Sequence, residues 1–216
     1  MEKFDLFIEK VNDVIPGSLF GLFSIISGIM GDVIAFLMYP GYNFLRMAVS
    51  DLCLGPGGLF FNLGNLFSGI FAFFFVNYLG NTFNEGNINP KFRKTAIICA
   101  NISCVCFIFL GIFCGSNIII AYIHGISAIT SMGFGFCYIT FYNILIIKDS
   151  KYSSSLGYFG FIVSLIFGLL IILFLLHILP ILRFIMVVLP LVEWLNTTAL
   201  IIWYIIIPLY MIYKKI

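Results

Sequence analysis

Six apolar stretches, each long enough to cross a bilayer, constrain this chain more than any other feature of its sequence. A helix that crosses the hydrocarbon core needs about 20 apolar residues. We assign residues 1–14 to a lead-in and residues 15–216 to one membrane domain. The sequence predicts an all-α integral membrane protein, a six-transmembrane-helix bundle. Its expected spans are residues 15–38, 58–79, 95–115, 118–147, 155–179 and 184–212.

The composition supports this class and excludes others. Of the 216 residues, 62% are hydrophobic and only 9% are charged, whereas about 25% of a soluble domain is charged. The mean hydropathy is +1.15, far too high for a disordered chain. A net charge of +2 gives no basic excess that could neutralise a phosphate backbone. We therefore expect no nucleic-acid partner.

The lysines and arginines predict an orientation, because cytoplasmic segments of membrane proteins carry an excess of them. With the amino terminus inside, only Arg46 and Arg183 of the eleven fall on the outer side. We predict a multi-pass protein of the cell membrane with both termini in the cytoplasm. The residues that fall on the inner side are Lys3, Lys10, Lys91, Arg93, Lys94, Lys148, Lys151, Lys214 and Lys215.

Residues 1–14 are interpreted as a short amphipathic helix on the inner membrane surface, with a simple helical lead-in as the alternative. The segment carries acids, whereas the first part of a secretory signal is basic, so we do not expect a signal here. Its apolar residues recur at helical spacing. They are Phe4, Phe7, Ile8, Val11 and Ile15.

The six cysteines show no metal-binding pattern. Five lie in predicted spans, where Cys behaves as a small apolar residue, and we interpret them as packing residues. Cys104 and Cys106 lack the paired spacing of a zinc site. Only Cys53 falls in an outer loop, and a Cys53–Cys114 bridge is the one disulfide left open there.

Ionisable residues concentrate in the outer half of the predicted bundle. A charge inside hydrocarbon costs at least about 2.5–3.5 kcal/mol, so each such residue needs a physical reason. Counting from the span ends, at about 1.5 Å per residue, places four of them within roughly 15 Å of the outer surface. They are Asp32, His124, His177 and Glu193.

Two interpretations of these residues stay open. They could line a polar pocket that opens to the outer leaflet or to outer water. Alternatively, Asp32 or Glu193 could pair with Arg46 or Arg183, and His124 could bond to a carbonyl, as polar groups in membrane bundles often do.

The first outer loop, residues 40–57, is rich in apolar and aromatic residues, so we expect it to pack over the bundle mouth. Ser50 or Asp51 could cap a short helix in it. Asn62 and Asn65 follow on the second span, three residues apart. That spacing puts them on one helix face, which we expect to line the interior beneath the loop.

Four patches of the sequence carry a family resemblance. They are Ser50-Asp51-Leu52 with Gly55-Pro56, Phe60-Phe61-Asn62-Leu63-Gly64 with Ser68-Gly69, His124 with Gly125, Ala128 and Phe134, and Glu193 with Trp203. They resemble a widespread prokaryotic membrane family catalogued as domain of unknown function 998. Cys53 departs from the Gly that this family tends to have. The resemblance implies a six-helix bundle with a pocket but no settled reaction. A more distant similarity is to the Frag1/DRAM/Sfk1 group, which is linked to lipid and anchor handling.

The favoured hypothesis is a protein that binds a membrane lipid or small amphiphile in an outer-facing pocket, or that serves as a subunit of a membrane complex. Arg46 would meet an anionic headgroup, because its planar guanidinium can bind two phosphate oxygens. We predict that His124 and Glu193 approach each other inside the bundle. Whether the chain forms a homo-oligomer or joins a larger complex stays open. The predicted ligand-binding residues are Arg46, Ser50, Asp51, Asn62, His124 and Glu193.

Two alternatives accompany this hypothesis. An intramembrane lipid hydrolase or transferase would use Ser50 or Asp51 with His124 as nucleophile and base. With two histidines in the chain, no three-ligand pattern for catalytic zinc is visible. The third hypothesis is haem ligation by His124 and His177. The favoured hypothesis needs no cofactor.

Overall fold

The computed structural model describes residues 10–11, 14–85, 88–115, 117–177 and 185–216. In these ranges, six long helices are long and apolar enough to cross a membrane, which confirms the predicted six-helix bundle. The amphipathic helix predicted for residues 1–14 falls largely outside the described residues. The elements are α2 (Gly17–Leu37), the 3-10 helix η1 (Val49–Leu54), α3 (Gly58–Thr82), α4 (Pro90–Ile112), α5 (Ile118–Lys148), α6 (Ser154–His177) and α7 (Ile185–Lys214).

Local capping explains where two of the helices begin. α4 begins at Pro90 rather than at residue 95, because the Asn89 side chain accepts a hydrogen bond from the Lys91 N–H at 2.9 Å. Proline suits the first helical position, where its missing N–H costs nothing. α5 begins in the same way, since the Asn117 side chain accepts from the Ile119 N–H at 2.9 Å.

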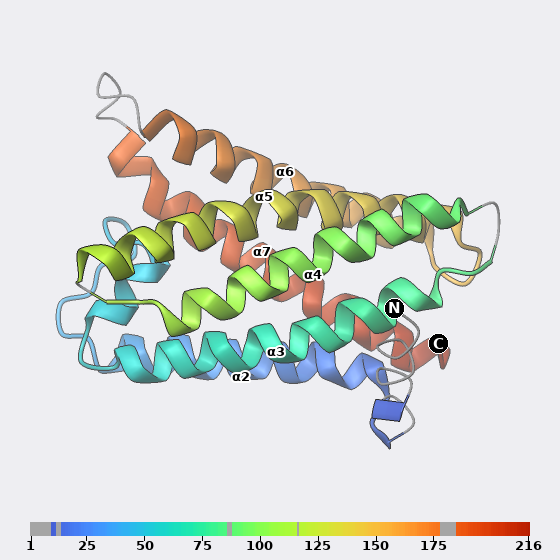
Figure 1. The fold of residues 1–216 in the computed structure, drawn as a ribbon, viewed down its shortest axis with the longest axis horizontal. Coiled ribbons are helices and arrows are strands. Elements are labelled where there is room, and N and C mark those ends of the chain that lie inside the picture. Colours follow the sequence, from blue (N-terminus) through green and yellow to red (C-terminus); the bar gives the residue numbers. More distant parts are fainter. Residues whose placement is uncertain (1–9, 12–13, 86–87, 116, 178–184) are drawn as a thin grey trace.

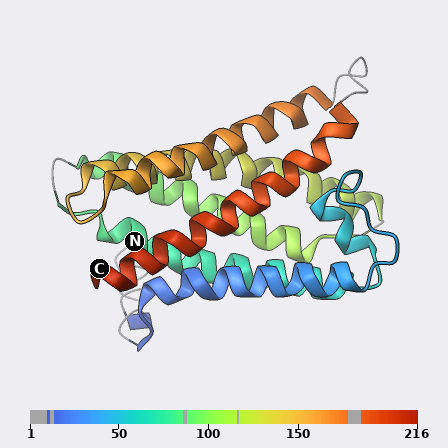
Figure 2. The same ribbon diagram turned by 180° about the vertical axis from the view of Figure 1, so that it is seen from behind.

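The six long helices form a ring in chain order (Figure 1). Each packs against the next, and α7 closes the ring against α2. Figure 2 shows α7 running obliquely across one face of the bundle. α2 begins and α7 ends at the same end of the bundle, where the Tyr78 hydroxyl donates to the carbonyl oxygen of Ile216 at 2.9 Å. We name this the terminal end, and the opposite end, which carries residues 38–57, the loop end.

Small residues allow neighbouring helices to approach closely. A Cβ atom on Gly64 of α3 would lie only 2.8 Å from the Cα atom of Gly31 in α2. A Cβ atom on Gly111 of α4 would lie 2.6 Å from the backbone nitrogen of Leu66. Glycine at these contacts lets the backbones pack directly, as is common between membrane helices.

The hydrophobic core occupies the half of the bundle nearest the terminal end. Trp203 of α7 is fully buried, and its ring lies edge-on to Tyr204 with centroids 5.2 Å apart. Phe75 of α3 and Tyr142 of α5 are also fully buried. Dense packing of these large side chains fills the ring at this end and leaves the other half less filled.

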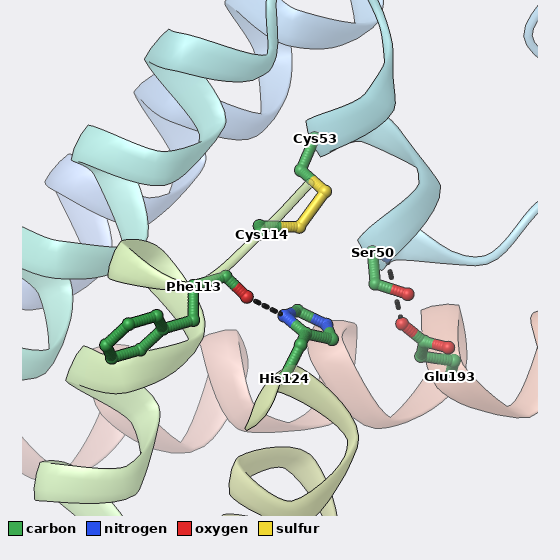
Figure 3. Close-up of a disulfide and its surroundings, with 6 residues drawn as sticks. All are labelled: Ser50, Cys53, Phe113, Cys114, His124 and Glu193. Atoms are coloured by element: carbon green, nitrogen blue, oxygen red, sulfur yellow. Dashed lines mark hydrogen bonds between the residues drawn. A yellow bond between two sulfur atoms is a disulfide. The ribbon is translucent and has the colours of Figure 1, made fainter. Parts of the chain in front are cut away.

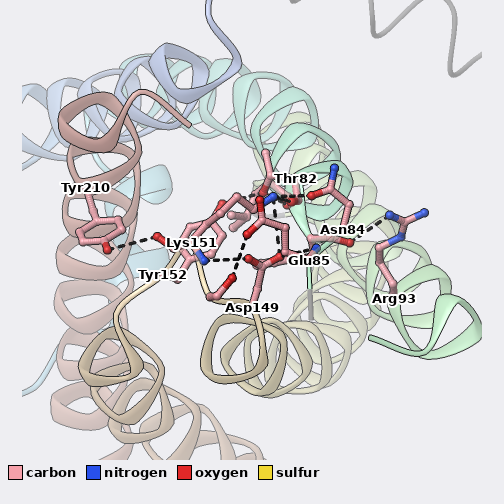
Figure 4. A network of polar contacts seen from close by, with 11 residues as sticks. Thr82, Asn84, Glu85, Arg93, Asp149, Lys151, Tyr152 and Tyr210 are labelled. Carbon is pink, nitrogen blue, oxygen red and sulfur yellow. Dashed lines mark hydrogen bonds and ion pairs between the residues drawn. The ribbon is translucent and has the colours of Figure 1, made fainter. Parts of the chain in front are cut away.

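A polar network closes the terminal end between the α3–α4 segment and the α5–α6 turn (Figure 4). The Asp149 side chain is fully buried and accepts hydrogen bonds from the backbone N–H groups of Glu85 at 3.2 Å and Lys151 at 3.0 Å. The Lys151 ammonium lies 3.7 Å from the same carboxylate. It also donates to the carbonyl of Thr82 and to the side chain of Asn84. Every polar group of this buried pair is thus provided with partners.

Candidate functional site

A cavity of about 260 Å³ lies inside the ring, between the loop end and the hydrophobic core. All six long helices and η1 contribute to its lining. Along α3 it extends from Phe61 to Ala72, about 16 Å at 1.5 Å per residue. Its volume is just below the roughly 300–1,000 Å³ of typical small-molecule sites. The space therefore suits a headgroup or a compact ligand rather than a whole lipid.

The lining combines apolar and aromatic side chains with three ionisable ones. Asp32 comes from α2, His124 from α5 and Glu193 from α7. The part of the lining that the structure describes contains no lysine or arginine. The amides of Asn65 and Asn196 add further polar groups. The cavity is thus acidic in character and mixed in polarity.

Glu193 connects α7 to the first loop (Figure 3). Glu193 is only 8% exposed, and its Oε1 accepts a hydrogen bond from the Ser50 N–H at 3.1 Å. The next residue, Trp194, donates its indole N–H to the carbonyl of Met47 at 3.2 Å. Two adjacent side chains of α7 therefore hold the loop over the cavity.

His124 is positioned by the turn that precedes its helix. Its Nδ1 lies 3.0 Å from the carbonyl oxygen of Phe113. Because a carbonyl only accepts, Nδ1 carries the hydrogen, and Nε2 of the neutral ring is left as an acceptor. Figure 3 shows the ring beside the Phe113 carbonyl, on the same side of the bundle as Ser50 and Glu193.

A disulfide joins Cys53 of η1 to Cys114, just after α4, with a Cα–Cα separation of 6.0 Å (Figure 3). The interpretation of Cys114 as a packing residue is therefore wrong, and the bridge that the sequence left open is formed. The loop folds back over the bundle mouth, which brings Cys53 to the end of a helix 61 residues further along the chain. The cysteines inside the helices are free, as expected, namely Cys99, Cys104, Cys106 and Cys137.

The middle of the loop of residues 40–57 packs over the bundle mouth as predicted, whereas Phe44, Leu45 and Leu54 are exposed. Val49 and Leu52 are buried, at 7% and 0% exposure. The Tyr42 hydroxyl donates to the carbonyl of Ala48 at 2.6 Å. Burial raises the pKa of this phenol, so it stays protonated and keeps donating. Phe44 packs edge-on against the ring of Trp194, with centroids 4.9 Å apart.

The six predicted ligand-binding residues separate into two groups. The structure places Ser50, His124 and Glu193 in the cavity lining, whereas Arg46, Asp51 and Asn62 lie outside it.

Each residue of the second group has a local reason for its position. Asp51 accepts a hydrogen bond from the Ala48 N–H at 2.8 Å and so caps its own short helix. Arg46 lies exposed on the loop. Asn62 lies where α3 contacts Gly111 of α4, and its buried Oδ1 has no partner among the described residues.

His124 and Glu193 line the same cavity but bond to different backbone groups. His124 contacts the carbonyl of Phe113, as the internal-pairing interpretation anticipated, and Glu193 accepts from the Ser50 N–H. No hydrogen bond joins the two side chains in the described part of the chain. The ion pair of Arg46 with Asp32 or Glu193, which the pairing interpretation allowed, is not formed among the described residues either.

The predicted site lacked Asn196 and left Asp32 without a role, whereas Asn65 lines the interior as its spacing predicted. Asn196 is 7% exposed, and its Oδ1 has no partner within the described ranges. It follows Glu193 by three residues on one helix, and this spacing could have revealed it. Asn65 also lines the cavity, and Asp32 does so without any described hydrogen bond or ion pair.

Comparison with known proteins adds a family but no activity. Residues 23–209 match a family of proteins of unknown function, DUF998, over much more than half of the chain. The chain belongs to the DUF998 family. The matched range includes every described cavity residue, from Ser24 to Tyr204, and it confirms the resemblance noted in the sequence. No curated protein and no solved structure matches this DUF998 chain.

The described residues of this DUF998 chain do not form a metal site. Within the described residues, no three His, Cys, Asp or Glu side chains gather in a way that could hold a metal ion. The side chain of His177, the second predicted haem ligand, lies outside the described side chains.

Proposed function

We propose that this DUF998 protein binds a lipid headgroup or a small amphiphile in its central cavity. The observation that carries the proposal is a cavity inside the ring whose polar lining is incompletely partnered. Asn196 Oδ1 is buried without a partner, and Asp32 makes no hydrogen bond or ion pair with any described residue. A buried polar group left unsatisfied costs about 1–3 kcal/mol, which a bound ligand would offset.

The rest of the lining suits an amphiphile. Its serines already bond within the protein: Ser24 donates to the carbonyl of Ser68 at 2.9 Å, and Ser103 donates to the carbonyl of Ser131 at 2.8 Å. They therefore leave the contact surface mainly to apolar and aromatic side chains such as Phe107. An apolar wall with a few unpartnered polar groups is typical of small-molecule sites.

The enzyme alternative has less support. A serine nucleophile needs a base within hydrogen-bond reach. No hydrogen bond joins Ser50 to His124 in the described part of the chain, and the histidine Nδ1 is already bonded to Phe113. Binding therefore accounts for the arrangement with fewer assumptions than hydrolysis or transfer.

We further propose that both termini lie in the cytoplasm of a cell membrane and that the cavity adjoins its outer face. The distribution of lysine and arginine supports this orientation. The disulfide Cys53–Cys114 lies at the loop end, and disulfides persist in oxidising compartments, which also favours an outer position. A reporter fused after Ile216 should be active only in the cytoplasm. Activity of that reporter only outside the cell would overturn the orientation.

A matched pair of glycine substitutions tests the binding site. A Cβ atom at Gly125 or at Gly133 of α5 would meet nothing within 4 Å, but only Gly125 lines the cavity. Gly125→Leu should fill the cavity, and Gly133→Leu is the control. Each protein is extracted into nanodiscs with its surrounding membrane, and the retained lipids and amphiphiles are measured by mass spectrometry.

The wild type and Gly133→Leu should retain a species that is enriched over the bulk membrane, and Gly125→Leu should lose it. The proposal fails if the wild type enriches nothing. It also fails if Gly125→Leu keeps the same species at the same level.

A further inference from the structure

We infer that the cavity selects an amphiphile whose headgroup is a primary ammonium. This inference rests on the proposed binding function and specifies the class of ligand. It follows from the charges, the unpartnered atoms and the aromatic rings of the described lining.

The charges of the cavity disfavour an anion. Asp32 and Glu193 come from α2 and α7, which pack against each other, and no lysine or arginine faces them from the described lining. Arg46, the cation that the sequence suggested for an anionic headgroup, lies outside the lining. An anionic headgroup would add a negative charge beside two acids in a region of low dielectric, where repulsion is strong. An ammonium would instead supply the missing counter-charge.

Several acceptors of the lining have no hydrogen-bond partner among the described residues, and the amide N–H groups of Asn65 and Asn196 have none either. The acceptors are Oδ1 of Asn196, the carboxyl oxygens of Asp32 and Nε2 of the neutral His124 ring. Glu193 Oε1 already accepts from the Ser50 N–H and can still accept from a ligand through its free lone pair. A primary ammonium carries three N–H donors, whereas a hydroxyl carries one. An ammonium can therefore donate to several of these acceptors at once, and it also carries the positive charge that an alcohol lacks beside Asp32 and Glu193.

The aromatic lining supports the same class. Rings of Phe61, Phe107 and Tyr204 face the cavity. Aromatic faces attract cations, and this attraction strengthens when the cation is removed from water. The same rings provide apolar contact for the first part of an alkyl chain. A compact amine head with an alkyl tail thus fits both the polarity and the volume of the cavity.

Three photoactivatable probes with the same twelve-carbon chain test this inference. Their headgroups are a primary amine, an alcohol and a carboxylate, and each is added in trace amounts to the full-length protein in phosphatidylcholine nanodiscs. Crosslinked residues are identified by mass spectrometry. We expect the amine probe to label the residues that line the cavity at least about tenfold more than the alcohol, and the carboxylate to label them least.

Isosteric variants show whether the acids cause this preference. Asp32→Asn removes one charge without removing a described hydrogen bond, and Glu193→Gln keeps the oxygen that accepts from Ser50. Each should lower amine labelling several-fold and leave alcohol labelling unchanged. Glu85→Gln, at the terminal end, removes an exposed acid and should change neither.

The outcomes separate the two proposals. If the alcohol or the carboxylate labels the cavity as strongly as the amine, the ammonium preference is wrong while cavity binding stands. Unchanged amine labelling in folded Asp32→Asn and Glu193→Gln would also overturn the preference. If none of the three probes labels the residues that line the cavity, cavity binding itself fails.

Discussion

At the terminal end of the bundle the buried Asp149 carboxylate is surrounded by donors, whereas at the loop end Asp32 and Asn196 face a cavity without a described partner. Both ends bury acids, but only at the terminal end do other groups of the described chain donate hydrogen bonds to both oxygens of the buried carboxylate. The terminal end also has an ion pair, that of Asp149 with Lys151. The described loop end has acids and no cation in its lining.

This difference suggests how a structural polar cluster can be told from a ligand site. A structural cluster satisfies its own groups, because each unsatisfied one lowers stability. An unpartnered atom alone is not sufficient, since the buried Nδ2 of Asn143 also lacks a partner and does not line the cavity. The loop end combines unpartnered atoms with space for a ligand, and this combination points to an external partner.

The largest effect on stability is expected from breaking the disulfide that joins the loop over the cavity to the segment after α4. Replacing Cys53 and Cys114 together with serine should lower the free energy of unfolding by about 4 kcal/mol, because the bridge closes a loop with a sequence separation of 61. Ligand retention should fall as well. Thermal unfolding and lipid mass spectrometry measure the two effects. Cys106→Ser, at a free cysteine, is the control, and an unchanged melting temperature in the double variant would contradict the prediction.

A smaller but still large effect is expected at the terminal end. Asp149→Ala should lower the free energy of unfolding by about 3 kcal/mol, because it removes the acceptor of the Glu85 and Lys151 N–H groups and the counter-charge of the Lys151 ammonium. Ligand retention should stay at the wild-type level, because this network lies outside the cavity. Glu85→Gln keeps its side-chain acceptor for Ser150 and serves as the control. Loss of ligand in folded Asp149→Ala would show that the terminal network is not purely structural and would contradict the comparison of the two ends.

An intermediate effect on stability is expected at Trp194, where α7 contacts the loop. Trp194→Phe keeps an aromatic ring beside Phe44 but removes the hydrogen bond to the Met47 carbonyl. We expect a loss of about 1 kcal/mol and faster hydrogen exchange in residues 43–54. Exchange in residues 82–85 at the other end should not change. Equally faster hydrogen exchange in both segments would mean that the Trp194 hydrogen bond does not stabilise the loop specifically.

The smallest change in stability is expected for the unpartnered amide of Asn196, and the partnered amide of Asn77 provides the comparison. Asn77 is partnered by Asn101, with N–O distances of 2.6 and 3.1 Å, whereas Asn196 Oδ1 has no partner. Asn77→Leu should therefore lower the free energy of unfolding by about 1–3 kcal/mol. Asn196→Leu should change it by less than about 0.5 kcal/mol or raise it, and should still reduce ligand retention. Equal destabilisation by both changes would show that Asn196 is structural.

The sequence could predict part of the site because depth in a membrane follows from counting residues. Asp32, His124 and Glu193 were placed in the outer half by their distance from the span ends, and all three line the cavity. Counting does not give direction around the helix. Asn62 and Asn65 are three residues apart, which separates them by about 60° around the axis, and only Asn65 reaches the cavity.

By itself, the sequence determined the six helices, their approximate bounds and the family, because the apolar length needed to span a bilayer is read along the chain. Only the tertiary structure decided that Cys53 meets Cys114, that Asp51 caps its own helix and that Arg46 stays outside the cavity. These outcomes depend on how the loop folds back over the ring. That fold is fixed by contacts such as those of Glu193 and Trp194, which lie more than a hundred residues further along the chain.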